Sequence, residues 1–197
     1  MTDKFRNRYR IASTRLKNWD YGWNATYFVT ICTKNRLCFF GDIDKKQEPL
    51  MQLTEIGKIA EIEWQKTFEL RPDMNLEMGE YVVMPNHFHA IIGIGCNKYN
   101  VDSGDIGVRD AMHRVSTGDD ETISAVNKFG PQSKNLASII RGFKSSVTMN
   151  ARKIDPDFGW QSRFHDHIIR NQHSFVRIQS YIIQNPMKWK NDTFYKK

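Results

Sequence analysis

The chain has 197 residues, 40% hydrophobic and 26% charged, which are the proportions of one globular domain large enough to bury a core. Lys and Arg outnumber Asp and Glu by 29 to 22, and the net charge of +7 favours a polyanionic partner. No apolar run approaches the roughly 18 residues that span a bilayer, and no apolar segment follows the basic N-terminus. We therefore expect a cytoplasmic protein with no membrane partner. The three cysteines form no CxxC pair, which argues against a disulfide framework or a cysteine zinc finger.

The first half of the chain predicts three strands and one helix. Residues 26–33 are β-branched and aromatic, and predict a strand. Residues 54–68 predict a helix, with Thr54 as the N-cap. Residues 75–84 and 87–94 predict two further strands, which the Pro85-Asn86 turn would join into an antiparallel hairpin.

The second half begins with a polar stretch. Residues 97–132 lack periodicity and predict a flexible insertion, which would either fold over a ligand or decorate the surface. A helix is expected from about 135 to 152, a strand over 160–169 and a last helix over 173–184. The order strand, helix, strand, strand, helix, strand, plus an extra C-terminal helix, predicts an α+β ferredoxin-like fold with an antiparallel sheet. We expect residues 1–197 to form one domain.

One face of the helix predicted at 135–152 is rich in cations. Arg141, Lys144 and Arg152 follow one another at helical spacing, away from the apolar stripe. Such a face can hold a phosphate backbone, although a solvated face is the commoner outcome.

Two histidines stand at alternate positions of the third predicted strand. Side chains at i and i+2 of a strand point the same way, so His87 and His89 would project side by side. Two imidazoles on one face of a strand can chelate a divalent cation. A bare HxH pattern is weak evidence by itself, because strand histidines often only form hydrogen bonds.

The last predicted helix carries a tyrosine and an amide one turn apart. Tyr181 and Asn185 are four residues apart and would share one helical face. The amide oxygen of Asn185 is a hard donor that suits Mg²⁺ or Mn²⁺. Pro186 disfavours the α conformation at Asn185 and would end or kink the helix there. The alternative is a tyrosine that covers the core and a simple helix stop.

The chain resembles the single-tyrosine transposases of the His-hydrophobe-His nuclease superfamily, and in particular the REP-associated tyrosine transposases. The resemblance rests on five segments: YFVTICTKNR at 27–36, VVMPNHFHAII at 82–92, RGFKS at 141–145, WQSRFHDHIIR at 160–170 and YIIQNP at 181–186. These segments follow the order of the family and are spread along the chain outside the termini and residues 97–132.

The resemblance implies a metal-dependent enzyme that cleaves and joins single-stranded DNA beside a hairpin. His87 and His89 would be metal ligands, Tyr181 the nucleophile that forms a 5′-phosphotyrosine, and Asn185 would stand at the position of the third ligand, which is often Gln in relatives. The metal would be Mg²⁺ or Mn²⁺. Some relatives are dimers that exchange the tyrosine helix and others act as monomers, so a homodimer is left open. Arg141, Lys144 and Arg152 would contact DNA, with Lys144 the favoured candidate.

Three other functions compete with this interpretation. A non-catalytic ferredoxin-like nucleic-acid-binding protein is the main alternative, but the RNP1 motif that Arg141-Gly142-Phe143 opens fails at the next two residues. A rolling-circle initiator or relaxase is disfavoured by the small size, by the single tyrosine in its YIxxNP context and by the absence of a helicase motif. A metal-binding protein of unrelated function is disfavoured by the Tyr181 segment.

Overall fold

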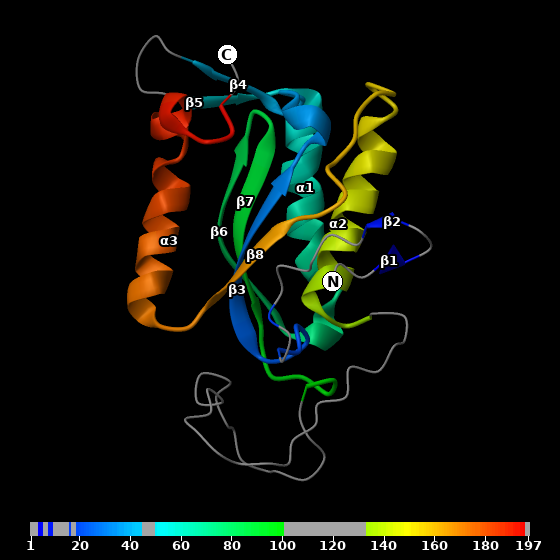
Figure 1. Ribbon diagram of the computed structural model, residues 1–197, viewed down its shortest axis with the longest axis vertical. Coiled ribbons are helices and arrows are strands. Elements are labelled where there is room, and N and C mark those ends of the chain that lie inside the picture. The colour runs from blue at the N-terminus through cyan, green and yellow to red at the C-terminus, as the bar shows by residue number, and fades with distance from the viewer. Residues whose placement is uncertain are drawn as a thin grey trace.

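A four-stranded antiparallel sheet forms the centre of the molecule, and its strands lie in the order β6-β7-β3-β8 (Figure 1). The computed structural model describes residues 4–5, 8–9, 16, 19–44, 50–100 and 133–195. The bounds are Ala25–Cys32 for β3, Leu76–Met84 for β6, His87–Ile94 for β7 and His165–Ile169 for β8. The three helices are α1 at Glu55–Glu69, α2 at Leu136–Ala151 and α3 at Gln172–Gln184. The predicted α+β ferredoxin-like fold is confirmed.

Helices α1 and α2 pack together on one face of the sheet (Figure 1). This face carries the alternate strand residues Phe88, Ala90 and Ile92 of β7, which belong to the main apolar cluster with Trp64 and Phe143 of the two helices. Both helices begin at side-chain caps. Thr54 accepts from the amide of Gly57, as predicted, and the side chain of Asn135 forms a capping box with Ser138.

Helix α3 covers the opposite face of the sheet (Figure 1). Ile178 and Ile182 of this helix pack against Ile91 of β7 and Ile169 of β8. Successive side chains of a strand point to opposite faces, so His87 and His89, which alternate with Phe88, lie on the α3 side with Ile91. The histidine pair and the tyrosine helix therefore share one layer of the fold.

The structure corrects two expectations near the C-terminal half. The predicted strand at 160–169 is a strand only from His165, and Trp160 makes a single bridge to Thr33. The amide of Gln161 still donates to the carbonyl of Cys32 at the end of β3, but the pairing shifts register before His165, which lies opposite Thr30. The indole of Trp160 donates to the carbonyl of Lys144 in α2 at 3.1 Å. Asn185 also keeps the α conformation, at φ −58° and ψ −44°, although Pro186 follows it. α3 ends at Gln184, and Pro186 then begins a 3-10 helix, η4, at Pro186–Asn191.

Several shorter elements were not predicted. β4 at Gly41–Asp44 pairs antiparallel with β5 at Leu50–Leu53, and β1 at Lys4–Phe5 pairs with β2 at Arg8–Tyr9. Two single-turn 3-10 helices, η1 at Lys34–Arg36 and η2 at Pro72–Met74, connect larger elements. No helix in the described part of the chain is long and apolar enough to cross a membrane.

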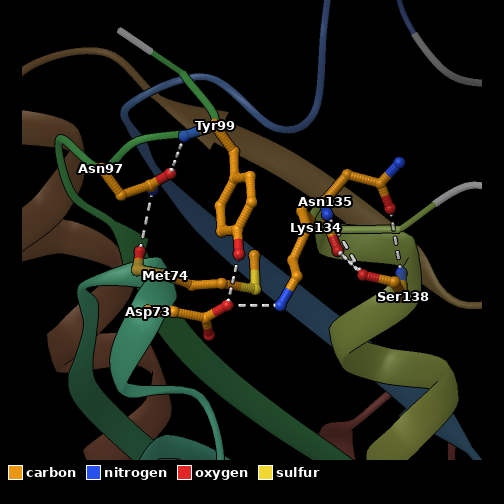
Figure 2. Close-up of polar contacts among 7 residues, drawn as sticks. All are labelled: Asp73, Met74, Asn97, Tyr99, Lys134, Asn135 and Ser138. Atoms are coloured by element: carbon orange, nitrogen blue, oxygen red, sulfur yellow. Dashed lines mark hydrogen bonds and ion pairs between the residues drawn. The ribbon is translucent and has the colours of Figure 1, made fainter.

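The ends of the predicted insertion at 97–132 are tied to one carboxylate (Figure 2). The phenol of Tyr99 donates to Asp73 Oδ2 at 2.7 Å, and the ammonium of Lys134 donates to the same oxygen. The ammonium also lies 4.9 Å from the centre of the Tyr99 ring. Tyr99 and Lys134, which flank residues 101–132, therefore meet at one carboxylate. Residues 101–132 themselves lie outside the described residues.

Candidate metal and nucleophile site

The hairpin between β6 and β7 fixes the position of the two histidines. Pro85 and Asn86 form the turn, and β7 starts at His87, which pairs with Met84 of β6 and with Cys32 of β3. The rings of His87 and His89 have centroids 4.5 Å apart, and both side chains are almost completely buried. The predicted pair of adjacent imidazoles is therefore present.

Asn86 determines which nitrogen of His87 carries the proton. Its amide nitrogen donates to the backbone carbonyls of Arg36, at 3.2 Å, and Phe194, at 2.9 Å. Its Oδ1 is therefore the atom that lies 2.9 Å from His87 Nδ1, and this nitrogen must be the donor. The lone pair of His87 is then on Nε2, an atom that is buried without a hydrogen-bond partner.

His89, in contrast, has a polar neighbour at each ring nitrogen. Its Nδ1 lies 2.8 Å from the hydroxyl of Thr30 on β3, and its Nε2 lies 3.3 Å from the phenol oxygen of Tyr181. Burial, with a smaller effect of His165, lowers the pKa of His89 to about 3. Burial and the neighbouring His89 lower the pKa of His87 well below its usual value. Both rings are neutral at pH 7, which is the form that binds metals.

Tyr181 lies at the boundary between this buried pair and solvent. Its side chain is 41% exposed, and its ring packs edge-on against His89 and Phe28, with centroids 5.3 and 6.1 Å away. Burial, followed by the charge of Asp192, raises the pKa of the Tyr181 phenol, and a hydrogen bond from the side chain of Asn185 acts in the opposite direction. The phenol is therefore protonated at neutral pH in the metal-free chain.

Asn185 contributes a second buried polar atom without a partner, after His87 Nε2. The residue is 2% exposed, and no described group donates to its Oδ1. The α conformation kept at position 185 places its side chain one turn after Tyr181, on the same face of the helix. Leaving a polar atom unpaired in a buried position is costly, so Asn185 Oδ1 is available to a ligand.

Asp192 joins the site although its sequence context gave no signal. Its carboxylate and the ring nitrogens of His87 and His89 lie within 4.8 Å of one another, so these residues could hold a metal ion. Asp192 follows η4, a 3-10 segment with no periodicity that would mark which side chains turn inward. Phe194, two residues further on, packs on His87 with ring centroids 4.6 Å apart.

The donor set fits a divalent cation. The described residues contain three buried side-chain nitrogen or oxygen atoms without a hydrogen-bond partner, and two of them, His87 Nε2 and Asn185 Oδ1, belong to this site. Two neutral imidazoles, an amide oxygen and a carboxylate are ligands that Mn²⁺ and Mg²⁺ accept, with the nitrogen atoms favouring Mn²⁺.

The three predicted DNA contacts lie elsewhere, on α2. Arg141 is exposed, the ammonium of Lys144 donates to the carbonyl of Gln161 at 2.6 Å, and Nε of Arg152 donates to the carbonyl of Phe158 at 3.0 Å. All three residues line one cavity beside this helix. The cavity is on the α1 and α2 side of the sheet, so the structure does not bring these residues into the layer of His87 and Tyr181.

The chain was compared with protein families and with solved structures. No protein-family model matches the chain. A solved structure of a REP-associated tyrosine transposase bound to a REP hairpin is 17% identical, with a TM-score of 0.50 over 91% of this chain and 74% of that one. At this identity the likeness shows a shared fold.

A relative from Haemophilus influenzae, described as an uncharacterized protein, is 35% identical over 184 residues. The match covers 93% of this chain and 92% of the relative. The chain is therefore a member of the same family as this Haemophilus influenzae protein.

Proposed function

We propose that the protein is a metal-dependent endonuclease and strand transferase for single-stranded DNA, a transposase-type enzyme that acts beside a hairpin. The observation that carries the proposal is the 3.3 Å approach of the Tyr181 phenol to His89 Nε2, next to the unpartnered nitrogen of His87. Phosphodiester transesterification by such an enzyme requires a nucleophile close to a group of residues that can bind a metal ion. The shared fold with a transposase bound to a REP hairpin supports the choice of DNA.

The metal would be held by His87 and His89, with oxygen donors from Asn185 and Asp192. When bound, the cation would polarise the scissile phosphate and stabilise the leaving oxygen. The Nδ1 contacts with Asn86 and Thr30 orient the two rings, and the Asn86 contact also fixes the lone pair of His87 at Nε2, because the amide oxygen can only accept. The chain thus has the outer contacts that metal-binding histidines usually possess.

Tyr181 would attack the phosphorus. The phenol loses its proton as its oxygen bonds to phosphorus, the bond from phosphorus to the 3′-oxygen breaks, and that oxygen leaves as a free 3′-hydroxyl. The 5′-phosphotyrosine conserves the bond energy, so a second 3′-hydroxyl can reverse the step and join a new strand. Tyr181 is 41% exposed, so a strand can approach this residue from solvent.

One chain contributes every group of this centre. The phenol contacts a histidine of its own chain, so the proposed reaction requires no exchange of the tyrosine helix between subunits. We propose that residues 1–197 act as a single catalytic domain in which 97–132 is an insertion, since its ends meet at Asp73.

The test compares the native protein with Tyr181→Phe on hairpin-bearing single-stranded DNA with Mn²⁺ or Mg²⁺. We expect a protein–DNA adduct that survives denaturing electrophoresis for the native protein and none for Tyr181→Phe. Tyr99→Phe is the matched control, because Tyr99 is 44% exposed against 41% for Tyr181 and lies at the insertion. This control should retain the adduct.

Two results would contradict the proposal. An adduct that persists in Tyr181→Phe would assign the nucleophile to another residue. The absence of an adduct in every protein, with tight DNA binding, would favour the non-catalytic binding protein instead.

A further inference from the structure

A cavity of about 820 Å³ lies between α2 and the segment at 158–164, outside the proposed metal site. One face of α2 forms one wall, and Trp160, Gln161, Ser162 and Phe164 form the other. Its volume falls in the range of about 300–1,000 Å³ that is usual for small-ligand sites.

The second wall is held against the helix by three hydrogen bonds. The indole of Trp160 donates to the carbonyl of Lys144, and the ammonium of Lys144 donates back to the carbonyl of Gln161. Nε of Arg152 donates to the carbonyl of Phe158. These bonds fix the distance between α2 and the facing segment, so the protein itself holds the two walls of the cavity in place.

The lining combines positive charge with aromatic surface. Among the described residues that line the cavity are Arg141, Lys144 and Arg152, and none of them is acidic. The bonds of Lys144 and Arg152 go to neutral carbonyls, and no carboxylate in the described part of the chain pairs with either cation. Trp160 and Phe164 supply ring surfaces, and Ser145 and Thr148 supply hydroxyls. A ligand that suits this lining has an anionic group and a flat apolar group.

The cavity wall is bonded to the strand that leads to the metal site. The amide of Gln161 donates to the carbonyl of Cys32 at 2.9 Å, and Cys32 pairs directly with His87. The cavity and the histidine pair thus lie on either side of the same strand end. A nucleic-acid strand that passes around this end would contact both.

We propose that this cavity binds an unpaired nucleotide of the single-stranded DNA whose phosphate reacts with Tyr181. The base stacks on the ring of Phe164 or Trp160, and Arg141 and Arg152 bind the adjacent phosphate. The proposal rests on the proposed function and adds a subsite to it. An acidic peptide would satisfy the charges but would leave the aromatic wall unused.

The experiment measures binding of labelled DNA hairpins with unpaired flanks by fluorescence anisotropy. All variants are made in the full-length chain with Tyr181→Phe, so no covalent step occurs. We expect Arg141→Glu to weaken binding by about tenfold or more, through loss of a phosphate contact. The matched control is Lys58→Glu, the same charge reversal at an exposed position of α1, which should change the affinity by less than about threefold.

Phe164→Leu tests the stacking contact. It should weaken binding of the intact strand by about fivefold or more. One abasic position in the unpaired flank should give the same loss, and Phe164→Leu should then have no further effect. Since Phe164 also packs on the core, Ser145→Glu provides a second variant at an exposed helix position in the lining. It should weaken binding as Arg141→Glu does.

Three outcomes would overturn the proposal. The first is an equal loss of DNA affinity in Arg141→Glu and Lys58→Glu, and the second is that no abasic position cancels the effect of Phe164→Leu. The third is that a glutamate-rich peptide displaces the labelled DNA as well as unlabelled DNA does. A different result would separate the two proposals. If the native protein forms no adduct in the cleavage assay but one abasic position still cancels the effect of Phe164→Leu on binding, the catalytic proposal is rejected and the nucleotide subsite stands.

Discussion

The two faces of the central sheet differ in what their side chains satisfy. On the α1 and α2 side, β7 contributes Phe88, Ala90 and Ile92 to one continuous apolar cluster. On the α3 side the same strand contributes His87 and His89, and the layer includes two buried polar atoms without partners. The first face is filled by apolar packing, whereas the second contains buried polar atoms that a ligand could contact. The alternation of side chains along β7 therefore places apolar core residues and the candidate site on opposite faces of one strand.

The separation is not complete. Trp64 Nε1, in the main apolar cluster, is the third unpartnered buried atom of the described residues. It is surrounded by rings, and no described ligand-type atom forms a cluster with it. His87 belongs instead to a group in which one ligand atom each of His87, His89 and Asp192 lie within 4.8 Å of one another. The grouping of possible ligand atoms, more than the number of unpartnered atoms, distinguishes the face of the candidate site.

The strongest test of this comparison substitutes neighbouring residues on opposite faces. His87→Ala should abolish Mn²⁺ binding and adduct formation, because it removes a lone pair that no other described group replaces, and it should largely preserve DNA affinity. Phe88→Ala should lower the free energy of unfolding by about 3–5 kcal/mol, the usual cost of truncating a buried phenylalanine. Calorimetric Mn²⁺ titration, the adduct assay and urea denaturation measure the three quantities.

Two outcomes would contradict the division of roles between His87 and Phe88. A greater loss of stability in His87→Ala than in Phe88→Ala would assign the histidine to the structural core. Retained Mn²⁺ affinity in His87→Ala would remove it from the metal site.

A smaller effect is expected for Asp192→Asn, which removes a charge and keeps the shape of the side chain. We expect the Mn²⁺ affinity to fall by about tenfold or more, the scale on which changes around metal ligands act. Asp155→Asn is the matched control, because Asp155 and Asp192 each accept from the backbone amide two residues later. Equal Mn²⁺ affinities of the two variants in calorimetric titration would exclude Asp192 from the site.

The smallest effect concerns the metal-free protein below neutral pH. The folded state holds the pKa of His89 at about 3 and that of His87 well below 6.5, whereas in the unfolded chain both are near ~6.5. The unfolded chain therefore binds more protons, and stability should fall as the pH falls below about 6.5, by at most about 1.4 kcal/mol per pH unit for each histidine.

Urea denaturation between about pH 7 and 5, with a chelator present, checks this slope. His89→Gln should reduce it, and His173→Gln, at an exposed position of α3, should leave it unchanged. An equal slope in His89→Gln and the native protein would contradict the assignment of the buried neutral ring.

The order of the main elements could be predicted because each depends on local spacing. The alternation of β7, the stripe of α1 and the caps at Thr54 and Asn135 are properties of a few consecutive residues. The β4–β5 hairpin was missed because its strands are four residues each, too short to display a period. The strand predicted from 160 is regular only from 165, because the antiparallel pairing with β3 shifts register between the Trp160–Thr33 bridge and the Thr30–His165 pair.

The sequence by itself determined the ferredoxin-like fold, the adjacent histidines and the one-turn spacing of Tyr181 and Asn185. Only the tertiary structure brought Asp192 beside the histidines, let Asn185 keep its helical conformation before a proline, and formed the cavity between α2 and residues 158–164. The physical reason is the sequence separation of the interactions involved. The spacing of apolar residues within one helix or strand predicts which of its faces is buried. The position of a donor on an irregular segment, in contrast, depends on packing against residues far away in the sequence.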